Sequence, residues 1–198
     1  MTPAGGPEAT GAPAASTLVV IDMQHVFADR DSQWRAPRFG EVVGPVRDLA
    51  AAYAPRVVFT RFVAPAVPEG AWRRYYELWP FALQPPESAI WDLVPEFAEH
   101  QDAAVDATTF GKWGPDLAAR LHGGAMVLAG VSTDCCVLST ALAAADAGVQ
   151  VKVAGQACAG IDDDSHAKAL DIMRLYAPLV EVISLDQALA EATEPAGA

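Results

Sequence analysis

Residues 17–22 read TLVVID, and this stretch decides the fold class of the chain. It is a short, unbroken apolar run, rich in β-branched side chains, that ends in the carboxylate of Asp22. Such a run is typical of a strand in a parallel sheet that is buried on both faces. In open sheets of this kind, ligands bind beyond the carboxyl ends of the strands. The stretch therefore predicts a parallel strand with Asp22 at the ligand-binding rim.

Similar apolar segments recur along the chain and alternate with helical ones. Further strands are expected at residues 56–60, 103–108, 125–129, 149–154 and 180–183. Helices are expected at residues 41–52, 115–121 and 162–176, with another that follows the turn at 130–134 and ends at Gly148. Alternating strands and helices predict the α/β class, as a three-layer α/β/α domain with a mostly parallel central sheet and right-handed crossovers.

The length of 198 residues suits one domain with short tails. We expect a disordered leader at 1–16, a folded domain over 17–190 and a C-terminal tail over 191–198. The leader is rich in Ala, Gly and Pro and lacks the basic and apolar regions of a signal peptide. The three cysteines are odd in number and two are adjacent, which makes a poor disulfide framework. We therefore expect a reducing, cytoplasmic location.

The charge balance limits the classes of partner that the protein is expected to bind. The chain carries 25 acidic and 13 Lys or Arg residues, which gives a net charge of −12. Such a surface repels nucleic-acid phosphates and anionic lipids. No apolar run reaches the roughly 18 residues that suggest a membrane span. We therefore expect a small-molecule substrate, with no nucleic acid and no membrane as partner.

Residues 62–95 differ from the rest of the chain, because they combine many prolines with much of the aromatic content. The aromatic residues include Trp72, Tyr75, Tyr76, Trp79, Phe81 and Trp91. A long irregular segment inside a compact domain is often a lid or binding loop. Aromatic side chains are also enriched at subunit interfaces. Both interpretations are open from the sequence.

Two cysteines follow the strand expected at 125–129, and Cys135 and Cys136 fall in the first turn of the next helix. The helix macrodipole there lowers a thiol pKa. With Thr133 as the N-cap, unpaired N–H groups of this turn can also stabilise an oxyanion. Asp22 is the candidate proton acceptor and Lys112 the candidate cation. Periodicity does not choose between the cysteines, and a cysteine in an apolar helix is ordinarily a small core residue.

Three segments in this order resemble the isochorismatase-like cysteine hydrolase superfamily, which includes nicotinamidases and N-carbamoylsarcosine amidases. They are VIDMQ at 20–24 together with Phe27, FGKW at 110–113, and GVSTDCCV at 130–137. The resemblance covers residues 17–185. It implies that Cys136 is the nucleophile, that Asp22 takes and returns the proton, and that Lys112 holds Asp22 and stabilises the thiolate.

The resemblance carries further expectations. It implies a non-proline cis peptide before Ser132, a bond that costs about 3–4 kcal/mol, and an oxyanion hole made of the Ser132 and Cys136 N–H groups. Phe27 matches a pocket-wall position of the family, although core packing explains it equally well. Further candidate substrate-binding residues are Trp113, Gln24 and Arg61. The resemblance also implies a homo-oligomer, a dimer or a tetramer.

One departure from the family pattern bears on cofactors. Nicotinamidases carry an Asp-x-His metal motif after the second strand, whereas residues 60–65 here read TRFVAP, and no histidine occurs between His25 and His100. We therefore expect no metal and no other cofactor, and the departure disfavours a nicotinamidase.

The function expected from these residues is a metal-independent cysteine hydrolase that cleaves an amide or ureido C–N bond through a thioester. The presence of Cys136 favours this reaction. The alternatives are an isochorismatase-type vinyl-ether hydrolase, a non-catalytic small-molecule-binding or scaffold protein with the same fold, and a redox sensor that uses Cys135 and Cys136.

Overall fold

The computed structural model describes residues 15–121 and 124–193. The leader expected at 1–16 lies outside the described residues except for Ala15 and Ser16, as do residues 194–198 of the expected tail. Helix α7 (Leu185–Thr193) continues past the expected domain end at 190. It does so because Ala188 and Ala192, one helical turn apart, are both buried against the domain.

A single six-stranded sheet forms the centre of the domain, with the strand order β3-β2-β1-β4-β5-β6 and every neighbouring pair parallel. The strands are β1 (Thr17–Ile21), β2 (Val57–Phe62), β3 (Val105–Ala107), β4 (Ala125–Val131), β5 (Gln150–Ala159) and β6 (Val180–Ile183). The expected fold class is confirmed. The strand that carries TLVVI lies between β2 and β4, so its carboxyl end is at the middle of one rim.

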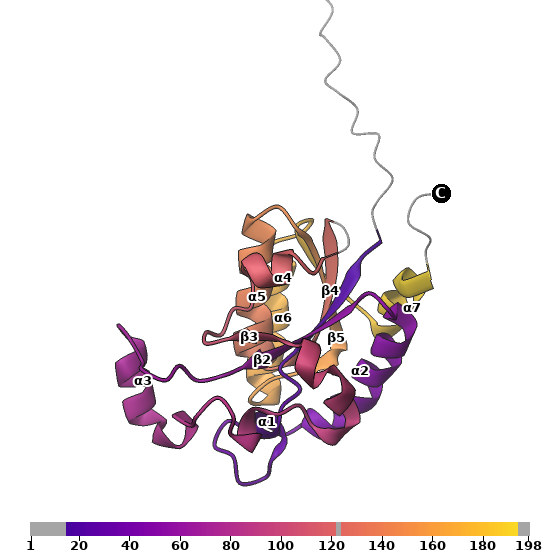
Figure 1. Cartoon of the computed structure of the whole chain (residues 1–198). Coiled ribbons are helices and arrows are strands. Elements are labelled where there is room, and N and C mark those ends of the chain that lie inside the picture. Colours follow the sequence, from indigo (N-terminus) through magenta and orange to yellow (C-terminus); the bar gives the residue numbers. More distant parts are fainter. Residues whose placement is uncertain (1–14, 122–123, 194–198) are drawn as a thin grey trace, which may run out of the picture.

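Helices cover both faces of this sheet (Figure 1). One layer is made of α2 (Phe39–Tyr53) and α7, and the other of α4 (Pro115–Ala118), α5 (Leu138–Asp146) and α6 (Asp163–Arg174). Strand β1 shows why two layers are needed. Its side chains alternate between the faces, so that Leu18 and Val20 pack into one apolar core and Val19 and Ile21 into the other, all fully buried.

Local sequence explains the two longest helices. In α2 the buried side chains recur every three or four residues, at Phe39, Val42, Val46, Leu49 and Tyr53, which is one face of a helix. Helix α6 begins where the Asp162 carboxylate caps it by accepting the Ser165 N–H at 2.6 Å. Asp163 and Asp164 then place negative charge at the positive end of the macrodipole.

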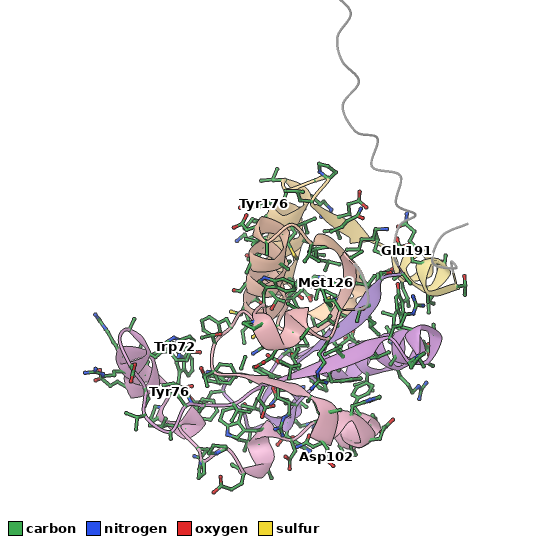
Figure 2. The ribbon with its side chains drawn as sticks, turned by 45° about the horizontal axis from the view of Figure 1, so that its top comes forward. Trp72, Tyr76, Asp102, Met126, Tyr176 and Glu191 are labelled. Carbon is green, nitrogen blue, oxygen red and sulfur yellow. The ribbon has the colours of Figure 1, made fainter. Side chains whose placement is uncertain are left out.

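The aromatic segment at 62–95 is less irregular than expected. It contains α3 (Trp72–Leu78) and the 3₁₀ turns η1 (Pro80–Ala82) and η2 (Ala89–Trp91), and the 3₁₀ segment η3 (Pro95–Ala103) follows. Helix α3 stands away from the sheet, and Trp72 and Tyr76 lie on its side toward the rest of the domain (Figures 1 and 2). The short helix α1 (His25–Ala28) connects β1 to a loop that leads to α2.

Several predicted boundaries were wrong. Helix α4 ends at Ala118 rather than 121, and β5 continues to Ala159 because it pairs with β4 again after an irregularity between Leu128 and Gly130. The helix after β4 begins with a π-helical turn, η4 (Thr133–Val137). Its N-cap is Ser132, with extended φ and ψ of −89° and 140°, and not Thr133. None of the helices in the described ranges is long and apolar enough to cross a bilayer.

Candidate active site

Asp22 follows β1 directly and is fully buried. Its backbone has a φ of 50°, in the left-handed region that Asp tolerates better than most residues. The Thr60 hydroxyl in the second half of β2 donates to Asp22 Oδ1 at 2.7 Å and accepts the Asp22 N–H at 3.3 Å. Two neighbouring strands thus orient one carboxylate, which fixes the direction of Oδ2.

Lys112 comes from the loop between β3 and α4, and its Nζ lies 3.0 Å from Asp22 Oδ2, with both side chains fully buried. The ammonium group also donates to the Thr109 carbonyl at 2.9 Å and lies 4.9 Å from the centre of the Phe62 ring. A buried charge is tolerated only where such partners compensate its lost hydration. Lys112 and Asp22 therefore stabilise each other as an ion pair.

Cys136 lies in η4 with only 2% of its surface exposed. A hydroxyl connects it to the Lys112 loop, since Thr140 Oγ1 accepts the Lys112 N–H at 2.9 Å and donates to the Cys136 carbonyl at 2.6 Å. The Ser132 carbonyl accepts the N–H groups of Cys135 and Val137, both at 3.1 Å. Along the chain, the Cys136 N–H falls between the N–H groups of Cys135 and Val137. The peptide bond between Val131 and Ser132 is cis.

The acidity of Cys136 differs from the expectation drawn from the macrodipole. Burial raises the pKa of the Cys136 thiol well above its ordinary value. The Lys112 charge lowers this pKa, while the Asp22 charge and a hydrogen bond from the thiol to that carboxylate raise it. The lowered thiol pKa expected from the macrodipole was wrong, because the loss of hydration on burial outweighs the attraction of one cation. The site holds a neutral thiol beside a carboxylate that can accept its proton.

Gly130 allows this arrangement to form. Its φ is +107°, and a Cβ at this position would lie 2.1 Å from the Ile21 carbonyl oxygen. The backbones of β1 and β4 can therefore approach this closely only if residue 130 lacks a side chain. This contact places the residues after β1 beside the turn that carries Cys136.

A cavity of about 260 Å³ opens above Cys136. Half of its lining residues are aromatic, namely Phe27, Trp34, Phe62, Tyr75, Trp79 and Phe110. The remaining lining residues are Gln33, Ser132, Asp134, Cys135, Cys136 and Ile161. Among the described residues that line it, none is Lys, Arg or His. The cavity therefore suits a small, largely apolar and uncharged molecule.

The four candidate substrate-binding residues have different positions. Phe27 lines the cavity above Cys136, whereas Trp113 lines a separate cavity of about 540 Å³. Gln24 is fully buried, and its amide bonds the backbone of Phe62 and Trp91. Arg61 pairs with Asp106 at 2.7 Å and lies 3.9 Å from Asp92. The structure thus brings Phe27 to the thiol and gives Gln24 and Arg61 partners within the protein.

Sequence reasoning missed several residues of the cavity. Phe62 and Phe110 follow the expected second and third strands, and the rule that ligands bind beyond strand ends would have found them. Trp34 and Gln33 lie in a polar loop with no pattern that indicates a site. Tyr75 and Trp79 were not missed, because they belong to the aromatic segment for which a lid or binding loop was one of the two expectations, and both line the cavity. No group of three His, Cys, Asp or Glu side chains within 15–121 and 124–193 is arranged to hold a metal ion.

A family model described as the isochorismatase domain matches residues 16–187. The chain belongs to the isochorismatase family. This family of hydrolases is also the one that the three sequence motifs indicated. A comparison with curated protein sequences gives no match.

Solved structures share the isochorismatase-family fold. A cysteine hydrolase from Pseudomonas syringae pv. phaseolicola 1448A has a TM-score of 0.79 at 18% identity, covering 90% of this chain and 92% of its own. An isochorismatase-like hydrolase from Alkaliphilus metalliredigens has a TM-score of 0.73 at 20% identity, covering 89% and 97%. A pyrazinamidase/nicotinamidase from Streptococcus mutans UA159 has a TM-score of 0.68 at 23% identity, covering 85% and 99%.

Proposed function

We propose that this chain is a metal-independent cysteine hydrolase that cleaves the C–N bond of a small, uncharged amide or ureido compound. The observation that carries the proposal is the buried Asp22–Lys112 ion pair, whose carboxylate accepts a hydrogen bond from the Cys136 thiol that lines a largely aromatic cavity. A carboxylate acceptor, a cation and a thiol are the parts that nucleophilic catalysis by cysteine requires.

The proposed reaction begins with a neutral thiol. As the Cys136 sulfur attacks the carbonyl carbon, its proton moves to Asp22, and Lys112 stabilises the developing negative charge. The carbonyl oxygen, now an oxyanion, accepts hydrogen bonds from the Ser132 and Cys136 N–H groups. Asp22 then returns the proton to the leaving nitrogen, the C–N bond breaks, and ammonia or an amine departs.

A thioester remains on Cys136 after this step. Water attacks the thioester carbon while Asp22 accepts one of its protons, and the C–S bond breaks. The sulfur takes the proton back from Asp22, and the carboxylic or carbamic acid leaves. Each proton that Asp22 accepts is returned, so the cycle regenerates the starting thiol. The proposal of a metal-free reaction rests on residues 60–65, which offer no histidine.

Charge and burial favour amide cleavage over the alternatives. Isochorismate is a dicarboxylate, and the described cavity wall presents Asp134 but no cationic side chain to it. A non-catalytic binding protein gains nothing from a buried ion pair, whose desolvation is costly. Burial raises the pKa of the Cys135 thiol to about 11, which makes this cysteine a poor redox sensor at neutral pH.

The test is ammonia release from a panel of neutral primary amides and ureides. We expect Cys136→Ala to lose activity by at least about 10³-fold, as removal of a nucleophile does. Cys135→Ala is the matched control, because it removes the neighbouring thiol of the same cavity, and we expect it to retain activity within about tenfold. Acid quenching of the wild type during turnover should leave an acyl group on Cys136, detected by mass spectrometry. Absence of ammonia from every compound, or equal losses in both variants, would reject the proposal.

A further inference from the structure

The loop that carries Lys112 is attached to the helical segment that carries Cys136. Lys112 lies outside every described strand and helix, so its backbone N–H has no partner from regular secondary structure. This N–H donates instead to Thr140 Oγ1 at 2.9 Å, across 28 positions of the chain. The preceding residue, Gly111, lies against Ser139, since a Cβ on Gly111 would be 3.6 Å from the Ser139 Cβ. The Lys112 loop therefore rests on the start of α5.

Thr140 is fully buried, and the groups that it meets fix the direction of both of its hydrogen bonds. A backbone N–H can only donate, so Thr140 Oγ1 is the acceptor in its bond with Lys112. A backbone carbonyl can only accept, so the same hydroxyl donates to the Cys136 carbonyl at 2.6 Å. One hydroxyl thus joins the backbone of the candidate nucleophile to the backbone of the residue that supplies the cation.

The two hydrogen bonds differ in what they imply. A threonine in a helix often bonds the carbonyl four residues earlier, so the contact with Cys136 is ordinary by itself. The contact with Lys112 is not ordinary, because it connects the helix to a loop from the other end of the β3–α4 connection. A buried N–H that loses its acceptor is strongly unfavourable. Without the Thr140 hydroxyl, the Lys112 loop would therefore have to move.

The position of the Lys112 backbone matters because of what its side chain does. Its Nζ lies 3.0 Å from Asp22 Oδ2, and its charge lowers the pKa of the Cys136 thiol. The attraction between charges falls with distance and is large where both groups are buried. A displacement of about 1 Å in an active site can cost about 10²-fold in rate. A contact that fixes Lys112 relative to Cys136 can therefore affect catalysis without touching the substrate.

We propose that Thr140 is a positioning residue, whose hydroxyl holds the backbones of Lys112 and Cys136 at the separation that the reaction requires. Thr140 is not among the residues that line the cavity above Cys136, so it has no contact with the substrate in this proposal. The inference rests on the proposed function, because it assigns a role in the same reaction. It predicts that loss of the hydroxyl lowers thiol reactivity and turnover and leaves substrate binding nearly unchanged.

The first measurement needs no substrate. The rate at which iodoacetamide alkylates Cys136 is followed by mass spectrometry in the Cys135→Ala protein, where peptide masses distinguish Cys136 from Cys158. Thr140→Val keeps the side-chain shape and removes the hydroxyl. We expect it to slow alkylation at neutral pH about tenfold, because a displaced Lys112 ammonium stabilises the thiolate less and so raises the thiol pKa. Thr140→Ser restores the hydroxyl and should stay within about threefold of the parent protein.

The second measurement uses the neutral amide of the panel that is hydrolysed fastest. We expect Thr140→Val to lower kcat by at least about tenfold and to change KM by less than about threefold, because Thr140 does not line the cavity. Thr17→Val is the matched control. It also changes a fully buried threonine to valine, but at the opposite end of β1 from Asp22, and alkylation, kcat and KM should all stay within about threefold.

If Thr140→Val does not fold, Thr140→Ala takes its place, because alanine also lacks the hydroxyl and favours the helix. Alkylation at the parent rate without the hydroxyl overturns the assignment, as does an equal slowing in Thr140→Ser or in Thr17→Val. An unchanged kcat for an amide that is hydrolysed also overturns it. If alkylation slows as expected but no amide is hydrolysed, the positioning role of Thr140 stands and the proposed reaction does not.

Discussion

At the scale of single residues, the chemistry depends on one ion pair withdrawn from water. Lys112 and Asp22 lie 3.0 Å apart with no exposed surface on either side chain. Removing one partner leaves the other charge buried and uncompensated, which is far more costly than losing a surface pair. The cost of leaving one of these buried charges without its partner can therefore be measured directly.

We expect Lys112→Met to lower the free energy of unfolding by about 3–5 kcal/mol, because Asp22 loses the cation that compensates its buried charge. The measurement is urea denaturation at neutral pH. Lys168→Met is the control, since Lys168 pairs with Asp164 on the surface of α6, and we expect no measurable loss there. Similar small losses in both variants would show that the buried pair contributes little to folding.

At the scale of elements, the end of β1 and the turn after β4 form one unit. Ile21 pairs with Gly130 in the sheet, and the absence of a side chain at residue 130 lets the two backbones meet. The Asp134 carboxylate ties a further segment to this unit. It accepts a hydrogen bond of 2.9 Å from the N–H of Ile161, which follows the end of β5. Position 130 therefore affects both folding and the site.

We expect Gly130→Ala to destabilise the protein by more than about 3 kcal/mol, for two reasons. The new Cβ clashes with the Ile21 backbone, and the positive φ is unfavourable for alanine. Gly148→Ala separates the two effects, since Gly148 also has a positive φ, of +88°, but a Cβ there meets nothing within 4 Å. It should lose only about 1–2 kcal/mol. The measurement is urea denaturation, and equal losses in the two variants would contradict a steric role for Gly130.

At the scale of the whole molecule, the surface charge and the cavity wall both disfavour anionic substrates. The net charge of −12 repels anions at a distance, and the described cavity wall offers no cation to hold one. Both effects favour uncharged substrates. The expected homo-oligomer and cytoplasmic location stay predictions.

Hexanamide and adipamate, the monoamide of adipic acid, in which a carboxylate replaces the terminal methyl group, provide a test of this selection. We expect kcat/KM for the neutral amide to exceed that for the anion by at least about tenfold at low salt, because the carboxylate finds no partner in the cavity. The difference should narrow between about 10 mM and 150 mM NaCl, since salt screens the long-range repulsion. A preference for the anion would mean that a cation reaches the substrate.

The sequence by itself determined the features that local patterns carry. The alternation of apolar strands with helices predicted the three-layer parallel fold, because burial on both faces leaves a continuous apolar run such as residues 17–21. The ordered motifs indicated the isochorismatase family. They also named Asp22, Lys112 and Cys136, which the structure places together.

Only the tertiary structure decided the features that depend on burial and on distant neighbours. The macrodipole argument made Cys136 acidic, but packing withdraws the thiol from water and raises its pKa. Gln24 and Arg61 looked like ligand-binding side chains until the fold gave them internal partners. Trp34 has no motif around it, and its place in the cavity wall is visible only once rings from several segments pack around it. Side-chain environment is a property of the packed chain, because it is made by residues that are far apart in the sequence.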